Sequence, residues 1–294
     1  MAIATTSAYP DGSSLANFNA WAQWVYDQFI TFGWVQTADT GQQVWPATGS
    51  VPSSPVYNVF KSADSLSIAY PIYIKIEMWA VGNVPYFGIT VGTGGTNGSG
   101  SLLSPTTNRV YGGGTPSFAC YIVDVSAFYP CFASGDSGSI RFGLFNQSVA
   151  TYGTYNSVSI IVARSRDGSG NQTGDYVMLW TACNNGKTFQ TVFTGGGGAN
   201  NEDITGSFIG ALPSATTSTT FGGVTMASPV FQNIGGLSNP TPDLLVGKYA
   251  DFAFGSSAAI TVYNVSHNYI SVGSNQVSNF LGSNSQCALL LRYE

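Results

Sequence analysis

The stretch IYIKIEMW, residues 72–79, alternates between aliphatic side chains and side chains that are aromatic or charged. Successive side chains of an extended strand point to opposite faces. The apolar set at every second position, from Ile72 to Met78, would therefore line one face. The pattern predicts a long strand with one buried face.

Shorter apolar and aromatic runs recur along the rest of the chain, separated by clusters of Gly, Asn, Ser and Pro. The further predicted strands are Tyr57–Phe60, Tyr86–Val91, Phe118–Val125, Ile140–Asn146, Val158–Arg164, Tyr176–Thr181, Thr188–Phe193, Tyr249–Phe254, Ile260–Asn264, Tyr269–Val272 and Cys287–Tyr293. This spacing is typical of an antiparallel sandwich or barrel. Strand and helix patterns do not alternate as they do in a parallel sheet. We therefore expect a mainly β fold with an antiparallel, sandwich-like body.

Helical periodicity is found near the start of the chain, where apolar residues recur at spacings of three and four. The pattern predicts one N-terminal amphipathic helix over Ser14–Phe32. A side-chain oxygen of Asp11, Ser13 or Ser14 can accept hydrogen bonds from the free backbone N–H groups of the first turn. Gly33 can take the left-handed conformation that ends a helix.

The aromatic residues of this predicted helix cover more than one of its faces. If a β body buries only one stripe of a helix, the remaining aromatic surface has to be covered by another subunit, because large exposed apolar patches are rare on monomers. We therefore expect this helix to lie at an interface between copies. The interface candidates are Trp21, Trp24, Phe29 and Phe32.

These patterns divide the chain into an N-terminal helical segment, residues 1–34, packed on a β-rich body, residues 35–294. Within the body, four consecutive glycines at 195–198 precede a polar run. Such a stretch is typical of a loop and marks a lobe boundary near 195–203. One large β body and two lobes joined there are both compatible with the sequence.

Charge is scarce: Lys and Arg number 9, Asp and Glu 14, and charged residues make up 8% of the chain, which gives a net charge of −5. An ordinary soluble domain has about 25% charged residues. So few cations argue against nucleic-acid binding, which depends on neutralising phosphates. No apolar run approaches the roughly 18 residues of a membrane-spanning helix. A surface of neutral polar groups repels other copies weakly and suits close packing between subunits.

The first residues lack the basic and apolar regions of a secretion signal, so we expect reduced thiols rather than disulfides. The cysteines form no C-x-x-C pair of the kind found in zinc sites. We expect them to be buried thiols; they are Cys120, Cys131, Cys183 and Cys287.

The sequence offers little for catalysis. A nucleophilic triad in nearly all its forms needs a histidine base, and the chain has one histidine, His267, and no G-x-S-x-G turn. Glycoside hydrolysis needs two facing carboxylates, yet Glu77 and Glu202 are the only internal glutamates, and turns explain most aspartates. We expect a protein that is not an enzyme and holds no cofactor.

The run DGSGNQTGD, residues 167–175, places an oxygen-bearing side chain at every second position, as calcium loops do. It lacks the glutamate that completes an EF-hand loop, and a glycine-rich hairpin connection between two strands is the simpler interpretation. We therefore assign no metal site. The calcium candidates, should the loop bind one, are Asp167, Ser169, Asn171 and Asp175, with Thr173 between them.

Several stretches, in order from Leu15 to Asp167, resemble a known family. They are Leu15-Ala-x-Phe18 with Trp21, Gly33-Trp34-x-Gln36-Thr37-x-Asp39-Thr40-Gly41, Tyr57-x-Val59-Phe60-Lys61-x-Ala63-Asp64-Ser65-Leu66, Pro71-Ile72-Tyr73-Ile74-Lys75-Ile76-Glu77, Ile89-Thr90-Val91-Gly92-Thr93-Gly94 with Gly98-x-Gly100, Ala133-Ser134-Gly135-Asp136 and Arg164-Ser165-Arg166-Asp167. Together they resemble virion structural proteins of tailed bacteriophages, a group described as minor structural or tail-associated. The last third of the chain matches loosely.

The resemblance implies a β-rich particle component that works as a multimer and has no known catalysis. We expect a part of the tail, baseplate or neck, assembled in the host cytoplasm into the virion with copies of itself and other virion proteins. One alternative is a capsid decoration protein. Another is a receptor or adhesion module that binds a host surface glycan through aromatics such as Tyr111, Tyr129, Tyr152 and Tyr155. A virion-borne glycan hydrolase is a third.

Overall fold

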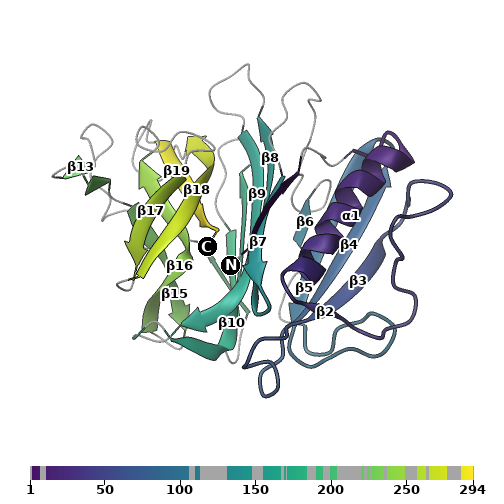
Figure 1. Ribbon diagram of the computed structural model, residues 1–294, viewed down its shortest axis with the longest axis horizontal. Helices are drawn as coiled ribbons and strands as arrows, with labels where there is room; N and C mark the ends of the chain where they lie inside the picture. Colours follow the sequence, from purple (N-terminus) through teal and green to yellow (C-terminus); the bar gives the residue numbers. More distant parts are fainter. Residues whose placement is uncertain are drawn as a thin grey trace.

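The computed structural model describes residues 2–6, 11–105, 110–112, 131–147, 155–166, 169, 171–183, 190–194, 199–203, 220–221, 224–225, 227–234, 237–248, 257–262, 265–276 and 286–293. In these residues the chain is mainly β, with three large antiparallel sheets and one helix near the N-terminus. The fold class predicted from the sequence is confirmed. Figure 1 shows the sheets side by side, with the helix on the first of them.

The first sheet has five strands in chain order: β2 (Val35–Gln36), β3 (Val56–Lys61), β4 (Tyr73–Val81), β5 (Val84–Gly92) and β6 (Val110–Gly112). The alternating stretch at 72–79 forms β4 and the residue before it, and its aliphatic set is buried, as predicted. Toward the end of β4 the other face is covered as well, because Trp79 stacks on Tyr86 of β5 with ring centroids 5.0 Å apart.

The helix α1 (Leu15–Thr31) covers one face of this sheet (Figure 1). Ser14 is its N-cap and accepts a hydrogen bond from the Asn17 N–H at 3.2 Å. Gly33, with φ of +89°, follows the C-cap Phe32 in the left-handed conformation that favours glycine. The predicted helix over Ser14–Phe32 is therefore confirmed, including its ends.

The second sheet has seven strands in the order β1-β7-β8-β9-β10-β11-β12. They are β1 (Ala2–Thr6), β7 (Cys131–Asp136), β8 (Ser139–Gln147), β9 (Tyr155–Arg166), β10 (Gln172–Cys183), β11 (Gln190–Thr194) and β12 (Ala199–Asp203). On β8 and β9, side chains on both faces of the sheet are buried. Phe142 and Val162 belong to the core that includes α1, whereas Arg141 and Ile161 point to the opposite face.

The third sheet has the order β15-β16-β19-β18-β17 and lies on that opposite side of the seven-stranded sheet (Figure 1). Its strands are β15 (Ala227–Ile234), β16 (Leu237–Lys248), β17 (Ser257–Val262), β18 (Val265–Gln276) and β19 (Gln286–Arg292); a small pair, β13 (Thr220–Phe221) and β14 (Val224–Thr225), precedes it. Ser134 Oγ of β7 donates a hydrogen bond of 2.9 Å to the Arg292 carbonyl of β19. The seven-stranded sheet is thus the middle layer.

The core of the first two sheets centres on Phe29 of α1. Its ring stacks on Phe60 of the first sheet, at 4.3 Å between centroids and 8° between planes, and lies 5.6 Å from Phe142 of the seven-stranded sheet. The helix therefore meets two sheets at once, and the assumption that a β body buries only one helix stripe is wrong.

The four interface candidates are accounted for by this arrangement. Trp21, Phe29 and Phe32 are 1%, 0% and 5% exposed, and Trp24 packs partly buried against the core, edge-on to Phe142 at 6.4 Å. The apolar surface of Trp21, Phe29 and Phe32 is covered within the chain and that of Trp24 is covered in part, so burial alone does not call for a neighbouring subunit, and the interface role stays a prediction.

Two predicted boundaries, the division at residue 34 and the lobe boundary near 195–203, can be compared with the strand pairings of the seven-stranded sheet. Residues 2–6 form β1 at the edge of the seven-stranded sheet. The predicted boundary near 195–203 falls where β11 and β12 pair with each other in that sheet. One β body or two lobes both stay predictions.

Candidate functional site

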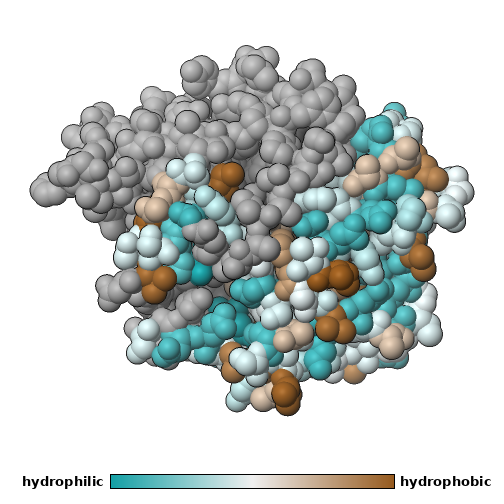
Figure 2. All heavy atoms as spheres, in the orientation of Figure 1, coloured by the Kyte–Doolittle hydropathy of each residue, from teal (hydrophilic) through white to brown (hydrophobic). Residues whose placement is uncertain are grey.

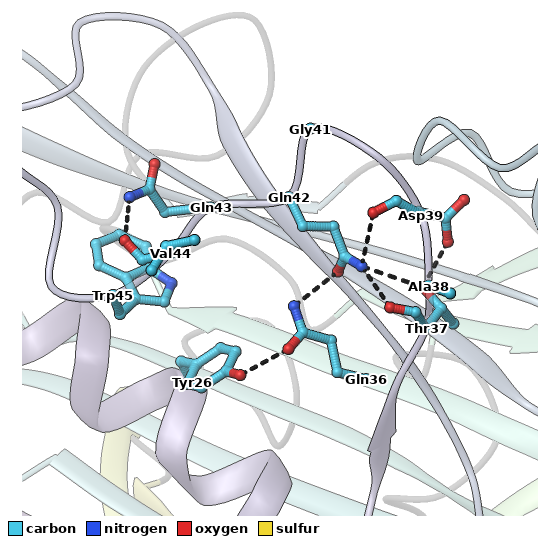
Figure 3. A pocket seen from close by; sticks show the side chains of 10 residues that line it. All are labelled: Tyr26, Gln36, Thr37, Ala38, Asp39, Gly41, Gln42, Gln43, Val44 and Trp45. Carbon is cyan, nitrogen blue, oxygen red and sulfur yellow. Dashed lines mark hydrogen bonds between the residues drawn. The ribbon is translucent and has the colours of Figure 1, made fainter.

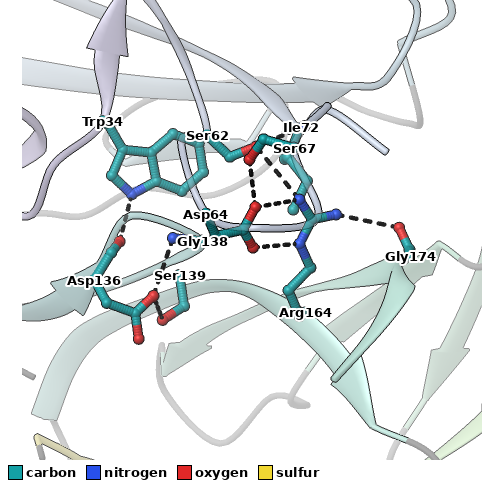
Figure 4. Close-up of polar contacts among 10 residues, drawn as sticks. All are labelled: Trp34, Ser62, Asp64, Ser67, Ile72, Asp136, Gly138, Ser139, Arg164 and Gly174. Carbon is teal, nitrogen blue, oxygen red and sulfur yellow. Dashed lines mark hydrogen bonds and ion pairs between the residues drawn. The ribbon is translucent and has the colours of Figure 1, made fainter. Parts of the chain in front are cut away.

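Two groups of polar side chains stand out in the described residues. One is internal and lies where the first two sheets meet; we call it the junction, and its members are Trp34, Ser62, Asp64, Ser67, Asp136 and Arg164 (Figure 4). The other lines an open surface groove beside α1 (Figure 3).

The centre of the junction is an ion pair. Arg164 lies near the end of β9 and has the same parity as Val162, so its side chain points toward the first sheet. Its Nε donates to Asp64 Oδ2 and its Nη2 to Asp64 Oδ1, both at 2.8 Å. This two-pronged geometry is the strong form of an arginine–carboxylate pair. The Arg164 side chain is fully buried and that of Asp64 nearly so.

Further hydrogen bonds complete the surroundings of the pair. Arg164 Nη1 donates to the Gly174 carbonyl of β10 at 3.2 Å, and Nη2 reaches Ser62 Oγ at 3.5 Å. Ser67 Oγ donates to Asp64 Oδ1. Burial by itself raises the pKa of Asp64, but the hydrogen bonds from Arg164 and Ser67 outweigh it and hold the pKa below its usual range.

A second set of contacts holds the β7–β8 turn against the connection between β3 and β4. Trp34 Nε1 donates to the Asp136 carbonyl at 2.9 Å, and the Ala63 N–H donates to the Ser137 carbonyl at 2.8 Å. A Cβ at Gly138 would lie 2.2 Å from Asp64 Oδ2. The turn approaches the ion pair so closely that only glycine fits there. The Asp64 carboxylate and the Arg164 guanidinium are both used in contacts within the chain, and these contacts link the first sheet to the seven-stranded sheet.

The groove has a volume of about 440 Å³. It is lined by Tyr26 of α1, Gln36 of β2 and the following loop: Thr37, Ala38, Asp39, Gly41, Gln42, Gln43, Val44 and Trp45. In Figure 3, Trp45 and Tyr26 lie at one side of the view and Thr37 and Asp39 at the other, with Gln42 between them.

Gln42 uses its full hydrogen-bonding capacity to hold the groove together. Its Nε2 donates to the Thr37 carbonyl at 2.7 Å and to the Asp39 carbonyl at 3.3 Å. Its Oε1 accepts from the Val59 N–H at 2.7 Å and from Gln36 Nε2 at 3.2 Å. An amide has two donor hydrogens and two acceptor lone pairs. Gln42 is therefore a framework residue that ties the loop to β3.

Asp39 is also part of the framework. Its carboxylate accepts from Thr37 Oγ1 and, at 3.1 Å, from the Gly100 N–H, and the residue is 8% exposed. Burial raises the pKa of Asp39, but the hydrogen bonds from Thr37, Thr96, Gly100 and Gly98 outweigh it and hold the pKa below its usual value. The carboxylate stays ionised and is hydrogen-bonded to the Thr37 hydroxyl and to the backbone of Gly100.

The two aromatic residues of the groove are fixed by hydrogen bonds at their polar ends. Tyr26 Oη donates to Gln36 Oε1 at 2.7 Å, and Trp45 Nε1 donates to Asn58 Oδ1 at 2.9 Å. Asn58 Nδ2 in turn donates to the Gln43 carbonyl at 2.8 Å. Burial, with a smaller contribution from the nearby charge of Asp27, raises the pKa of Tyr26, so its hydroxyl remains a donor.

The calcium candidates are placed in and beside a hairpin. Strands β9 and β10 pair antiparallel, which confirms the hairpin interpretation of residues 167–175. Ser169 and Asn171 are exposed in the connection and Asp175 is exposed in β10, whereas Asp167 lies outside the described residues. Within the described ranges no three His, Cys, Asp or Glu side chains come together as metal ligands would.

The other residues singled out from the sequence are spread over the fold. His267 lies in β18 opposite Ile260 of β17, and its ring meets Tyr269 edge-on at 6.5 Å. Tyr111 is in β6 and Tyr155 in β9, whereas Tyr129 and Tyr152 are not among the described residues. Cys131, Cys183 and Cys287 lie in β7, β10 and β19, Cys120 lies outside the described ranges, and the burial of the thiols stays a prediction.

Sequence reasoning missed both the junction and the groove. Arg164 and Asp64 are 100 residues apart, and no local pattern connects them. The sequence signal for the junction was Arg164 at the end of the apolar run SIIVAR, because an arginine next to a buried strand is conspicuous in a chain with only 9 Lys and Arg residues. For the groove, it was three glutamines within eight residues, followed by Trp45.

In the part of the chain that is described, no helix is long and apolar enough to cross a membrane. No protein-family model, curated protein or solved structure matches the chain.

Proposed function

We propose that this chain is a non-enzymatic structural component of a tailed-bacteriophage virion, in its tail, baseplate or neck. It assembles there with copies of itself and with other virion proteins. The proposal rests on the resemblance described above and on where the resembling residues lie in the fold.

The observation that carries the proposal is the junction. Trp34, Asp64, Asp136 and Arg164 come from four separate blocks of the resemblance, and they meet at one internal place (Figure 4). Their polar groups pair with one another and with backbone, which supports a shared framework that sets the angle between two sheets. Resembling residues that build an internal framework are what a structural role requires.

The surface composition also favours assembly. Charged residues make up 8% of the chain, and in the coloured part of Figure 2 hydrophilic and neutral residues prevail, with small apolar areas between them. Interfaces have cores depleted of charge, and a weakly charged surface opposes contact with other subunits little.

Immunogold electron microscopy of purified particles tests the proposal. An antibody raised against the full chain should label one end of the tail or the neck. Label spread over the head would favour the capsid decoration alternative. Particles that carry no label, while the lysate of infected cells contains the chain, would contradict a structural role in the virion.

A further inference from the structure

We infer that the groove between α1 and the 37–45 loop binds an uncharged glycan, with Trp45 as the stacking platform and Gln36 and Gln43 as the hydrogen-bonding groups. This inference goes beyond the assembly role and does not depend on it. It is argued from the groove's charge, its remaining hydrogen-bonding capacity and its rigidity.

The groove offers a ligand no positive charge, and its one negative charge, the ionised Asp39, is already hydrogen-bonded within the chain. Asp39 is the one carboxylate among the lining residues, and its two oxygens are occupied by Thr37 Oγ1 and the Gly100 N–H. Tyr26, with its raised pKa, is neutral near pH 7. No Lys, Arg or His lines the groove. A phosphate, a nucleotide or an acidic sugar would find no cation to neutralise it and would be repelled by the ionised Asp39, so the groove favours a neutral ligand over an acidic one.

The glutamines on either side of Gln42 retain hydrogen-bonding capacity. Gln36 uses one Nε2 hydrogen toward Gln42 and one Oε1 lone pair toward Tyr26. Gln43 uses its Nε2 toward the Val44 carbonyl. The second Nε2 hydrogen of Gln36, the second lone pair of its Oε1 and the Oε1 of Gln43 therefore remain for a ligand, since none of these atoms has another partner in the described residues. Donors and acceptors side by side match the hydroxyls of a sugar, each of which both donates and accepts.

Trp45 supplies an apolar surface of fixed orientation. Its Nε1 is held by Asn58, and its ring packs against Phe18 at 6.1 Å between centroids, yet the residue still lines the groove. The C–H face of a pyranose ring is apolar and stacks on such a ring, while its hydroxyls reach the neighbouring amides. A rigid aromatic loses little conformational entropy on binding.

The groove is also preformed and accessible. The bonds of Gln42 fix the 37–43 turn against β3 without a ligand, so binding does not have to order the loop. The volume of about 440 Å³ falls within the roughly 300–1,000 Å³ of small-molecule sites. Val44, the neighbour of Trp45 at the rim of the groove, is 79% exposed, so the rim is open to solvent at this point.

The test uses the full chain on a printed array that carries neutral glycans together with sialylated and sulfated ones. The inference predicts binding to neutral glycans, and the strongest neutral hit is then titrated by calorimetry. Val44→Glu, which places a bulky charge at the rim, should abolish that binding, and Gln43→Ala should weaken it about fivefold through the loss of one hydrogen-bond acceptor.

The matched control is Val81→Glu, the same change at an exposed valine at the end of β4, outside the groove. It should bind as the wild type does, and all three variants should keep the wild-type melting temperature. The inference is overturned if no neutral glycan binds, if only acidic glycans bind, or if Val44→Glu and Val81→Glu behave alike.

Discussion

The guanidinium of Arg164 and the carboxylate of Asp64 form two parallel hydrogen bonds of 2.8 Å between β9 and the connection from β3 to β4 (Figure 4). The pair is a charged contact that joins the seven-stranded sheet to the sheet covered by α1. Taking both charges out of water has a large cost, which is offset by the pairing, by the hydrogen bond that Ser67 donates to Asp64 and by the one that Arg164 donates to the Gly174 carbonyl. We expect the pair to contribute a defined geometry between the two sheets.

Removing one partner of this pair should be costly. Asp64→Asn keeps the side-chain shape but leaves the buried Arg164 guanidinium without its counter-charge, so we expect a loss of about 3–5 kcal/mol in the free energy of unfolding. Urea denaturation measures it. Asp27→Asn, at an exposed position on α1, should change stability by less than about 0.5 kcal/mol. If the two substitutions changed the free energy of unfolding equally, the ion pair would not be a main contributor to the contact between the two sheets.

The same pair should make the protein sensitive to acid. The pKa of Asp64 is lower in the folded protein than its ordinary value of 3.8, so its contribution to stability is complete above that value and is lost as the pH falls through the folded pKa. Melting curves from pH 7 downward should therefore show wild type and Asp64→Asn converging below about pH 4. A gap in melting temperature that stays constant down to pH 2.5 would speak against this assignment.

Trp24 should act within the chain rather than between copies. It packs against the core and meets Phe142 edge-on, so Trp24→Ala should cost about 2–4 kcal/mol by removing a partly buried aromatic side chain. Sedimentation should show the oligomeric state unchanged. Ile30→Ala, on the exposed side of α1, serves as the control and should leave the melting curve nearly unaltered. If Trp24→Ala dissociates an oligomer at an unchanged melting temperature, the interface role expected from the sequence would be restored.

Gly138 should not tolerate a side chain. A methyl group there would meet the Asp64 carboxylate at 2.2 Å, so Gly138→Ala should displace the β7–β8 turn or the ion pair and cost about 1–3 kcal/mol. Ser137→Ala, one residue earlier in the same turn, keeps the backbone carbonyl that accepts from Ala63 and should be nearly neutral. Thermal melting of the two variants compares them directly. A neutral Gly138→Ala would show that the turn lies farther from Asp64 than the structure places it.

The elements that could be predicted from the sequence are those whose pattern is local. The alternation in 72–79 and the helical spacing over Ser14–Phe32 carry their own periodicity, and both elements form as predicted. Strand β16 was not predicted, because Pro240 and Pro242 interrupt its first half and prolines argue against a strand interior. Strand β1 has one large apolar side chain, Ile3, among Ala and Thr, and is recognisable only from its pairing with β7.

The roles of the site residues could be predicted less well, because each role depends on contacts with residues that are distant in the sequence. The aromatic excess of α1 is correct as a sequence observation, but its explanation is a second sheet that reaches Phe29 through Phe142. Asp64 and Arg164 each look like ordinary surface charges until the fold brings them together. Gln42 binds the backbone of Val59, 17 residues away, and no pattern of spacing predicts that contact.

Quantitative mass spectrometry of purified virus particles tests the central claim, that this chain is a structural part of the virion, most directly. The account predicts that the chain co-purifies with particles at a fixed copy number that fits the cyclic symmetry of a tail, baseplate or neck, in multiples of three or six. A count in the hundreds would move it to the capsid surface. Particles without the chain, from infections in which the chain is made, would contradict the account.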